Sequence, residues 1–330
     1  MSEKHSTLTS ITGVPVDVPV GSNSTGASAQ VSRVGGQTRE TNTPARDEPE
    51  RPARPHSTRA GRGRIGGVHL ARIAEGLSDR DRQLLGSIAA HSYLSTKHIE
   101  GLWFGGRSTT TAERLARRAM TRLERLGLVQ PLERRVGGVR AGSSARIWQL
   151  SAAGRRLVAD HGDAKRPHEP SPRLLAHALA VADTRVTIHQ IPDAMPTIST
   201  IVVQIEAAAW RRYLGLGGDR RLLKPDLAVT LYGQDDQGSF EDRWFIVVDC
   251  GTESLPTLLK KCRQYDDYRH SGDEQTAHDV FPRTLWVMGG PRAVHRAHNL
   301  EARLARADYP DGMFTVVLPE QVSAAIGGAS

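Results

Sequence analysis

The run of five apolar residues at 244–248, which ends in Asp249, constrains the fold more than any other segment of the chain. Unbroken apolar runs of this length are typical of a central strand that is buried on both faces of a sheet. The sequences KPDLAVTLYG before it and LPTLLKKCRQYDDY after it predict a neighbouring strand and a covering helix. Further strands are expected within 197–206, 283–290 and 314–319, and a basic surface helix within 294–306. This order predicts a mixed sheet flanked by helices.

Acidic side chains stand at the ends of the two central strands. Asp226 opens one strand, Asp249 ends the next, and Glu253 and Lys261 follow. Two strands joined by a short turn bring such carboxylates together at one margin of the sheet. A cluster of this kind can hold a divalent metal through oxygen ligands. The same spacing also fits ordinary solvated acids at the edge of a sheet.

The segment resembles the replication-relaxation family of actinobacterial plasmid and mobile-element proteins, whose C-terminal half is similar to PD-(D/E)xK nucleases of the restriction-endonuclease fold. The matching positions are Pro225, Asp226, Asp249, Gly251, Thr252, Glu253, Lys261 and Tyr265. Upstream, the helix expected at 174–188 with His177 and the acidic strand end at Glu206 are also similar. The resemblance spans about residues 75–290.

This resemblance implies a catalytic set of Glu206, Asp226, Asp249 and Lys261. Asp226 and Asp249 would hold Mg²⁺ with help from Glu206, and Lys261 would position water or offset phosphate charge. His177 is interpreted as a structural histidine rather than a base or ligand. The chain departs from the pattern at Val247, where the family has Glu, so a magnesium-dependent endonuclease or nickase and a non-catalytic fold without a cofactor both remain open.

Gly251 marks a second departure, because it stands where nucleases of this fold ordinarily carry a strand Lys.

The net charge of the chain favours nucleic acid as the partner. Lys and Arg outnumber Asp and Glu by 44 to 36, which gives a formal net charge of +8 at pH 7. A positive surface attracts polyanions because neutralised phosphates release counterions. The alternative interpretation is that the excess of basic residues reflects only the Arg-rich composition that a GC-rich genome encodes.

The N-terminal half predicts a winged helix-turn-helix at 67–160, preceded by a disordered basic arm at 1–66. Ser78 is expected to cap the first helix, Ser95 to precede the second, and Gly127 to end the third. In that third helix, residues 115, 119, 123 and 126 form the expected apolar face. A polar, basic hairpin follows and reads as the wing.

Basic residues on the third helix and the wing are the predicted contacts to double-stranded DNA. They are Thr109, Arg114, Arg118, Arg122 and Arg125 on the helix, and Arg134, Arg135, Arg140 and Arg146 in the hairpin. Winged helices also serve as protein-contact modules, and an Arg-rich helix face is often only a solvated one. A linker with three prolines at 161–173 is expected to separate this domain from a nuclease-like domain at 174–330, which makes the chain α+β.

Other classes of protein find little support. The two cysteines, Cys250 and Cys262, exclude a disulfide framework, and no segment approaches the roughly 20 apolar residues of a membrane span. No phosphate-binding loop, nucleophile elbow or tyrosine relaxase motif with clustered histidines is recognisable. We therefore expect a cytoplasmic DNA-binding protein of plasmid or mobile-element replication, with plasmid replication or transfer proteins as further partners. A transcriptional regulator or a non-catalytic factor for an origin or transfer site is the alternative.

Overall fold

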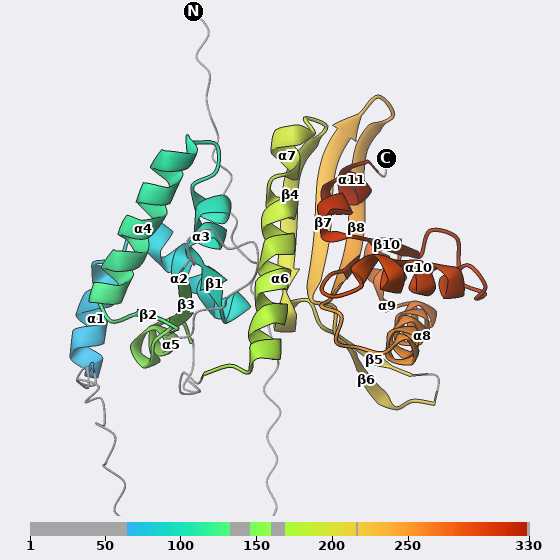
Figure 1. The fold of residues 1–330 in the computed structure, drawn as a ribbon, viewed down its shortest axis with the longest axis horizontal. Coiled ribbons are helices and arrows are strands. Elements are labelled where there is room, and N and C mark those ends of the chain that lie inside the picture. The colour runs from blue at the N-terminus through green and yellow to red at the C-terminus, as the bar shows by residue number, and fades with distance from the viewer. Residues whose placement is uncertain (1–64, 133–145, 160–168, 216, 329–330) are drawn as a thin grey trace, which may run out of the picture. The chain divides into compact units, whose positions relative to one another are not determined.

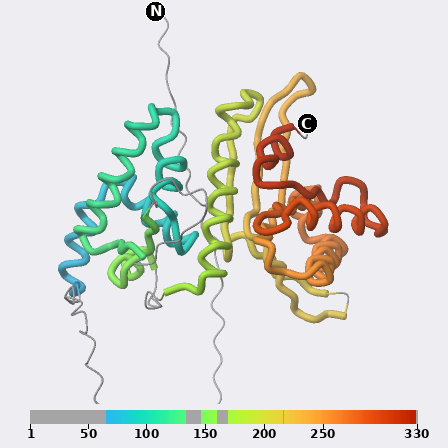
Figure 2. Tube along the Cα trace, viewed as in Figure 1, coloured from blue at the N-terminus to red at the C-terminus, as the bar shows by residue number. Residues whose placement is uncertain are grey.

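The structure is a computed structural model that describes residues 65–132, 146–159, 169–215 and 217–328. Residues 64–330 form one unit, and the expected arm at 1–66 lies almost entirely outside the described residues. The described chain contains both helices and strands, grouped in runs, as Figures 1 and 2 show, so the predicted α+β class is confirmed. Within the described ranges, no helix has both the length and the apolarity that a membrane crossing requires.

The first part of the unit consists of helices around a small antiparallel sheet. The helices are α1 (Gly67–Glu75), α2 (Asp79–His91), α3 (Thr96–Trp103), α4 (Thr109–Arg125) and α5 (Ala152–Val158), and the strands are β1 (Leu94–Ser95), β2 (Val129–Pro131) and β3 (Ile147–Leu150), in the order β1-β3-β2. Ser78 caps α2 as predicted, and Ser95, expected only to precede the next helix, caps α3; each forms a reciprocal capping box. Gly127 follows α4 with a φ of 71°, which suits a residue without a Cβ.

The buried stripe of α4 differs from the expected one. Ala112, Ala116, Met120 and Leu123 are buried, whereas residues 115, 119 and 126 are only partly buried. Large apolar residues dominate a periodicity estimate, but the small alanines let α4 approach its neighbours closely, so the alanine stripe faces the core. The arginines of α4 consequently point farther from the core than the sequence suggested.

Residues 133–145 lie outside the described part of the chain, and with them Arg134, Arg135 and Arg140 of the expected wing. Arg146, at the start of the returning strand, is described. Its guanidinium lies 5.3 Å from the ring centroid of Trp148 and 3.3 Å from the carboxylate of Glu124. Arg146 is therefore tied to the body of the unit.

The second part is built on a five-stranded mixed sheet. Its strands are β4 (Ile198–Ile205), β7 (Leu227–Asp235), β8 (Gly238–Asp249), β9 (Arg283–Met288) and β10 (Phe314–Val317), in the order β10-β9-β8-β7-β4. β7 is antiparallel to β4 and β8, while β8, β9 and β10 run parallel. The predicted strands are thus all present, and β8 is interior to the sheet as its apolar run indicated.

Helices cover both faces of this sheet (Figure 1). One face packs on α6 (Pro172–His189), α7 (Ile191–Ala194) and α11 (Val322–Gly327), and the other on α8 (Leu255–Ser271) and α10 (Ala293–Leu304). Ile246 and Val248 point to the first core, and Phe245 and Val247 to the second. The sequence did not predict α1, α7, α9 (Asp273–His278), α11 or the hairpin of β5 (Arg211–Leu214) and β6 (Arg220–Leu223), because these elements are short or lack a clear apolar period.

Helix α6 contacts elements from both parts. Leu175 and Ala178 pack with Tyr93 and Ile147, while Val181 and Ile188 join the core beneath the large sheet. Asp183 also accepts a 2.8 Å hydrogen bond from the imidazole of His98 on α3. Although the sequence predicts α6 as the first element of a separate domain, the helix shares its surface between the two cores.

Candidate functional site

Three side chains from separate elements converge beside the large sheet. His177 lies in the second turn of α6, Glu206 follows β4 directly, and Asp226 precedes β7. One ligand atom from each side chain lies within 4.8 Å of the other two. Two carboxylates and one imidazole are donors that divalent metals accept. These three residues are the group within the described ranges that could hold a metal ion together.

Strand pairing positions the two carboxylates. Ile205 pairs with Leu227, so the end of β4 lies beside the start of β7. The amide of Glu206 donates to the carbonyl of Asp226 at 2.9 Å, and the amide of Val248 donates to Asp226 Oδ2 at 2.7 Å. Asp226 is thereby fixed to both neighbouring strands by backbone groups, which hold its side chain at the cavity.

Glu206 itself adopts an unusual backbone conformation. Its φ is +50°, in the left-handed region that residues other than glycine rarely adopt. Backbone strain of this kind costs about 1 to 3 kcal/mol and is concentrated at functional sites. The strained turn directs the chain from β4 into the β5–β6 hairpin while leaving the Glu206 carboxylate near Asp226.

The electrostatics of the cluster are strongly coupled. His177 Nε2 lies 3.1 Å from Asp226 Oδ1, and this hydrogen bond, followed by the neighbouring Cys250 side chain, raises the pKa of His177 to about 10. Burial, and then the charge of Asp226, raise the pKa of Glu206 above its ordinary value. The raised pKa favours a proton between His177 and the Asp226 carboxylate at neutral pH, and a metal that binds the His177 nitrogen must displace that proton.

The cluster opens into a cavity of about 650 Å³ that also receives Asp249 and Lys261. Asp249 is buried, and its carboxylate pairs with Arg296 of α10, whose Nη1 also donates to the carbonyl of Glu253 at 2.7 Å. Lys261 Nζ lies 2.8 Å from the carboxylate of Glu253. Both predicted residues thus line the cavity, but each is held by a partner of opposite charge.

Tyr265 closes one wall of the cavity. Its ring is buried at 2% exposure, its hydroxyl has no hydrogen-bond partner among the described residues, and burial raises its pKa well above the ordinary value. The ring packs on Phe245 at 5.9 Å between centroids, so Tyr265 belongs to the core between the sheet and α8.

The sequence therefore identified part of this cluster. Glu206 and Asp226 were predicted site residues, whereas His177 was interpreted as structural and Arg296 as part of a basic surface helix. A histidine one helix away from the acids carries no local signal that it faces them. Likewise, nothing in the helical pattern of α10 indicates that Arg296 reaches Asp249.

The predicted DNA contacts on α4 fall into two groups. Thr109, Arg114, Arg118 and Arg125 are exposed, and among the described residues the three arginines have no carboxylate partner. Arg122 instead pairs with Asp81, a buried carboxylate in the capping box of α2. The side chain of Arg122 is therefore partly committed to holding α2 and α4 together.

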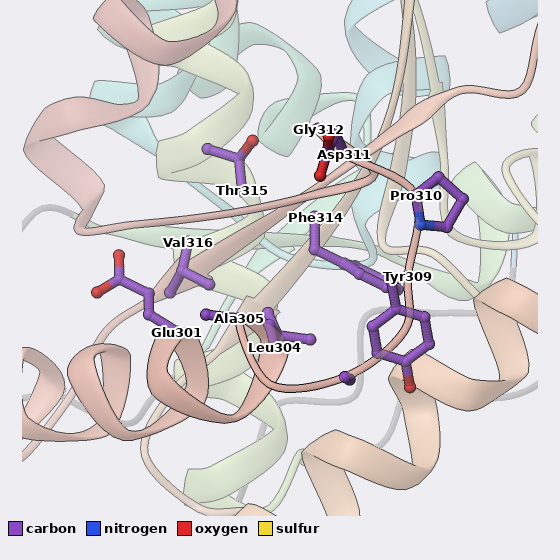
Figure 3. Close-up of a pocket in the computed structure, with 11 residues that line it drawn as sticks. Glu301, Leu304, Ala305, Tyr309, Pro310, Asp311, Gly312, Phe314, Thr315 and Val316 are labelled. Atoms are coloured by element: carbon purple, nitrogen blue, oxygen red, sulfur yellow. The ribbon is translucent and has the colours of Figure 1, made fainter.

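A second cavity, of about 420 Å³, lies between α10 and β10 (Figure 3). Its carboxylates are Glu301, on α10, and Asp311, in the loop before β10, and Figure 3 shows them apart from each other. Because these acids do not converge, this cavity lacks the cluster of donors found around Asp226.

Comparison with known proteins gives one family. The family model described as Replication-relaxation matches residues 85–284, a span that includes α4, His177, Glu206, Asp226, Asp249 and Lys261. Neither the curated proteins nor the solved structures give a significant match to the chain. Because the family model covers more than half of the 330 residues, the chain belongs to the replication-relaxation family.

Proposed function

We propose that this protein binds double-stranded DNA in plasmid or mobile-element replication and that its C-terminal part is a metal-dependent nuclease. The convergence of His177, Glu206 and Asp226 in one cavity carries this proposal. A mixed five-stranded sheet with helices on both faces supports the restriction-endonuclease-like fold that the family resemblance implied.

The donor set suits Mg²⁺ or Mn²⁺. Glu206 and Asp226 offer carboxylate oxygens, which hard cations prefer, and the His177 nitrogen, once the metal has displaced its proton, adds a ligand that Mn²⁺ accepts more readily than Mg²⁺. A metal bound there supplies Lewis-acid activation of phosphate or water. Lys261 and Arg296 are paired with Glu253 and Asp249, so they balance these two carboxylates beside the cavity and lower their repulsion of an approaching phosphate.

The N-terminal part is proposed to deliver this site to DNA as a winged helix. Three helices, α2 to α4, and the strands β2 and β3 have the order of that motif, in which the third helix enters the major groove. The exposed Arg114, Arg118 and Arg125 on α4 support this role, because they are available to phosphates.

A non-catalytic factor that binds an origin or transfer site is the second candidate. Val247 replaces the family's Glu, and Arg296 neutralises Asp249 within the cavity. Loss of one acid and pairing of another weaken a two-carboxylate metal site. Under this alternative the same surfaces bind DNA but the strand is not cut.

Nicking of supercoiled plasmid with Mg²⁺ or Mn²⁺ tests the proposal. We expect the wild type to nick and Asp226→Asn to lose nicking while keeping its DNA affinity, because Asn retains an oxygen that accepts from the Val248 amide. Asp311→Asn, an exposed acid outside the cavity, is the matched control and should nick normally. DNA binding without nicking by the wild type with either metal would leave only the second candidate.

A further inference from the structure

The β5–β6 hairpin is inserted between the two carboxylates of the site. Glu206 precedes it and Asp226 follows it, and the two are joined by the hydrogen bond from the Glu206 amide to the Asp226 carbonyl. Trp210, Leu222 and Lys224, at the base of the hairpin, line the same cavity as the acids. The hairpin therefore borders the mouth of the candidate nuclease site.

One face of the hairpin is fastened to α8 and α9. Tyr213 is buried and its ring lies 5.0 Å from that of Tyr268. Arg211 Nε lies 2.7 Å from the buried carboxylate of Glu274, and Arg221 Nη1 lies 2.7 Å from Asp267. These contacts hold the hairpin in place and neutralise the arginines of this face.

The opposite face has a different composition. Arg212 pairs across the hairpin with Leu222, and Leu214 with Arg220, so two arginines and two leucines alternate on one surface. Leu214 is 61% exposed and Leu222 is 39% exposed. Arg212 and Arg220 are exposed and, among the described residues, neither has a carboxylate partner.

Lys224 extends this surface toward the cavity. It is exposed, and its Nζ lies 4.7 Å from the ring centroid of Trp210, which orients the ammonium group without neutralising it. Arg212, Arg220 and Lys224, which have no carboxylate partner among the described residues, thus lie on one face of the hairpin, and Lys224 lines the cavity that carries Glu206 and Asp226. Exposed leucines and one tryptophan are placed among them.

We propose that this outer face of the β5–β6 hairpin binds the sugar-phosphate backbone of duplex DNA and holds it over the cavity. The inference rests on the proposed function and adds the substrate-binding element of the same site. Arg212, Arg220 and Lys224 contact phosphates, while Leu214, Leu222 and Trp210 contact sugars and base edges.

Charge and shape both favour DNA as the occupant. A phosphate that approaches Glu206 and Asp226 is repelled unless cations nearby offset its charge, and the hairpin supplies Lys224 in the cavity lining, with Arg212 and Arg220 farther along the same face. A two-stranded β-ribbon also fits the major groove of B-DNA. Because the arginines of the inner face are neutralised, the unpaired charge is confined to the side of the hairpin that faces solvent.

The test measures how the affinity of the full chain for a short fluorescent duplex depends on salt, in EDTA so that no cutting occurs. Each phosphate contact adds about 0.9 to the slope of log affinity against log salt. We expect Arg212→Gln/Arg220→Gln to lower the slope by about 1.8 and Lys224→Gln to lower it by about 0.9. Arg303→Gln/Arg306→Gln changes two exposed arginines, one in the last turn of α10 and one just after it; this variant removes the same charge as the double variant and should change the slope little.

The outcomes separate this inference from the proposed function. If only the hairpin variants and Arg114→Gln/Arg118→Gln on α4 lower the salt slope of binding, both the hairpin surface and the proposed DNA binding are supported. An unchanged slope in both hairpin variants, with a lowered slope in the α4 variant, overturns the hairpin surface and leaves DNA binding in place. If the hairpin double variant and the α10 variant lower the slope equally, the hairpin surface is overturned as well, since the loss of net charge alone then explains both changes. Wild-type protein without salt-dependent binding overturns the inference and the proposed function together.

Discussion

His177 and Asp226 form a hydrogen bond of 3.1 Å although 49 residues separate them in the chain. The contact joins the second turn of α6 to the start of β7, and Glu206 completes the group. By contrast, Asp249 lies in the same cavity but pairs with Arg296. The cavity therefore contains one cluster of candidate ligands and two further acids, Asp249 and Glu253, that are each paired with a cation.

This difference predicts unequal effects on metal affinity. Asp226→Asn should weaken Mn²⁺ binding by more than about tenfold, because a charged donor within the cluster is lost. Asp249→Asn should change it by less than about threefold, since Arg296 already balances that carboxylate. Isothermal titration calorimetry of the full chain measures both. Comparable losses for the two variants would place Asp249 among the ligands and contradict the assignment.

The two kinds of arginine on α4 should respond differently to substitution. Arg114→Gln/Arg118→Gln is expected to lower the salt slope of DNA binding by about 1.8 without changing stability, because both side chains are exposed and unpaired among the described residues. Arg122→Gln should instead lower the free energy of unfolding by roughly 1 kcal/mol, since it leaves buried Asp81 without its cation. Urea denaturation and binding titrations separate the two effects, and an unchanged stability for Arg122→Gln would argue against the tie between α2 and α4.

Buried His91 should make stability depend on pH. Burial, and next the charge of Arg185, lower its pKa to about 3, while the unfolded chain retains the ordinary value of about 6.5. A depressed histidine pKa means that the unfolded state binds the proton first, so stability falls as pH drops below about 6.5 and continues to fall toward pH 3. At about pH 5.5 the loss from this residue is about 1.4 kcal/mol.

His91→Gln provides the comparison, because glutamine does not titrate and its amide oxygen can accept the hydrogen bond that Arg185 donates to His91. Urea denaturation of both proteins at about pH 7.5 and 5.5 measures the difference. Between these two pH values the free energy of unfolding of the wild type should fall by about 1.4 kcal/mol more than that of the variant. Parallel losses in the two proteins would show that other groups cause the acid sensitivity.

The sequence by itself determined the elements whose signals are local. Consecutive apolar residues predicted β8 as an interior strand, serines predicted the starts of α2 and α3, and Gly127 predicted the end of α4. The acids at the strand ends were also predicted, because strand pairing brings the ends of neighbouring strands together. These features depend on residues that are close in the chain or on a fixed periodicity.

Only the tertiary structure decided which charges meet. Asp249 pairs with Arg296 at a separation of 47 residues, and Asp226 with His177 at 49, and neither pairing follows from periodicity. The alanine stripe of α4 faces the core because small side chains allow close packing, which hydrophobicity alone does not reveal. The partner of a side chain depends on how the helices pack on the sheet. Packing therefore decides that Asp249 is paired with an arginine while Asp226 joins the cluster of candidate ligands.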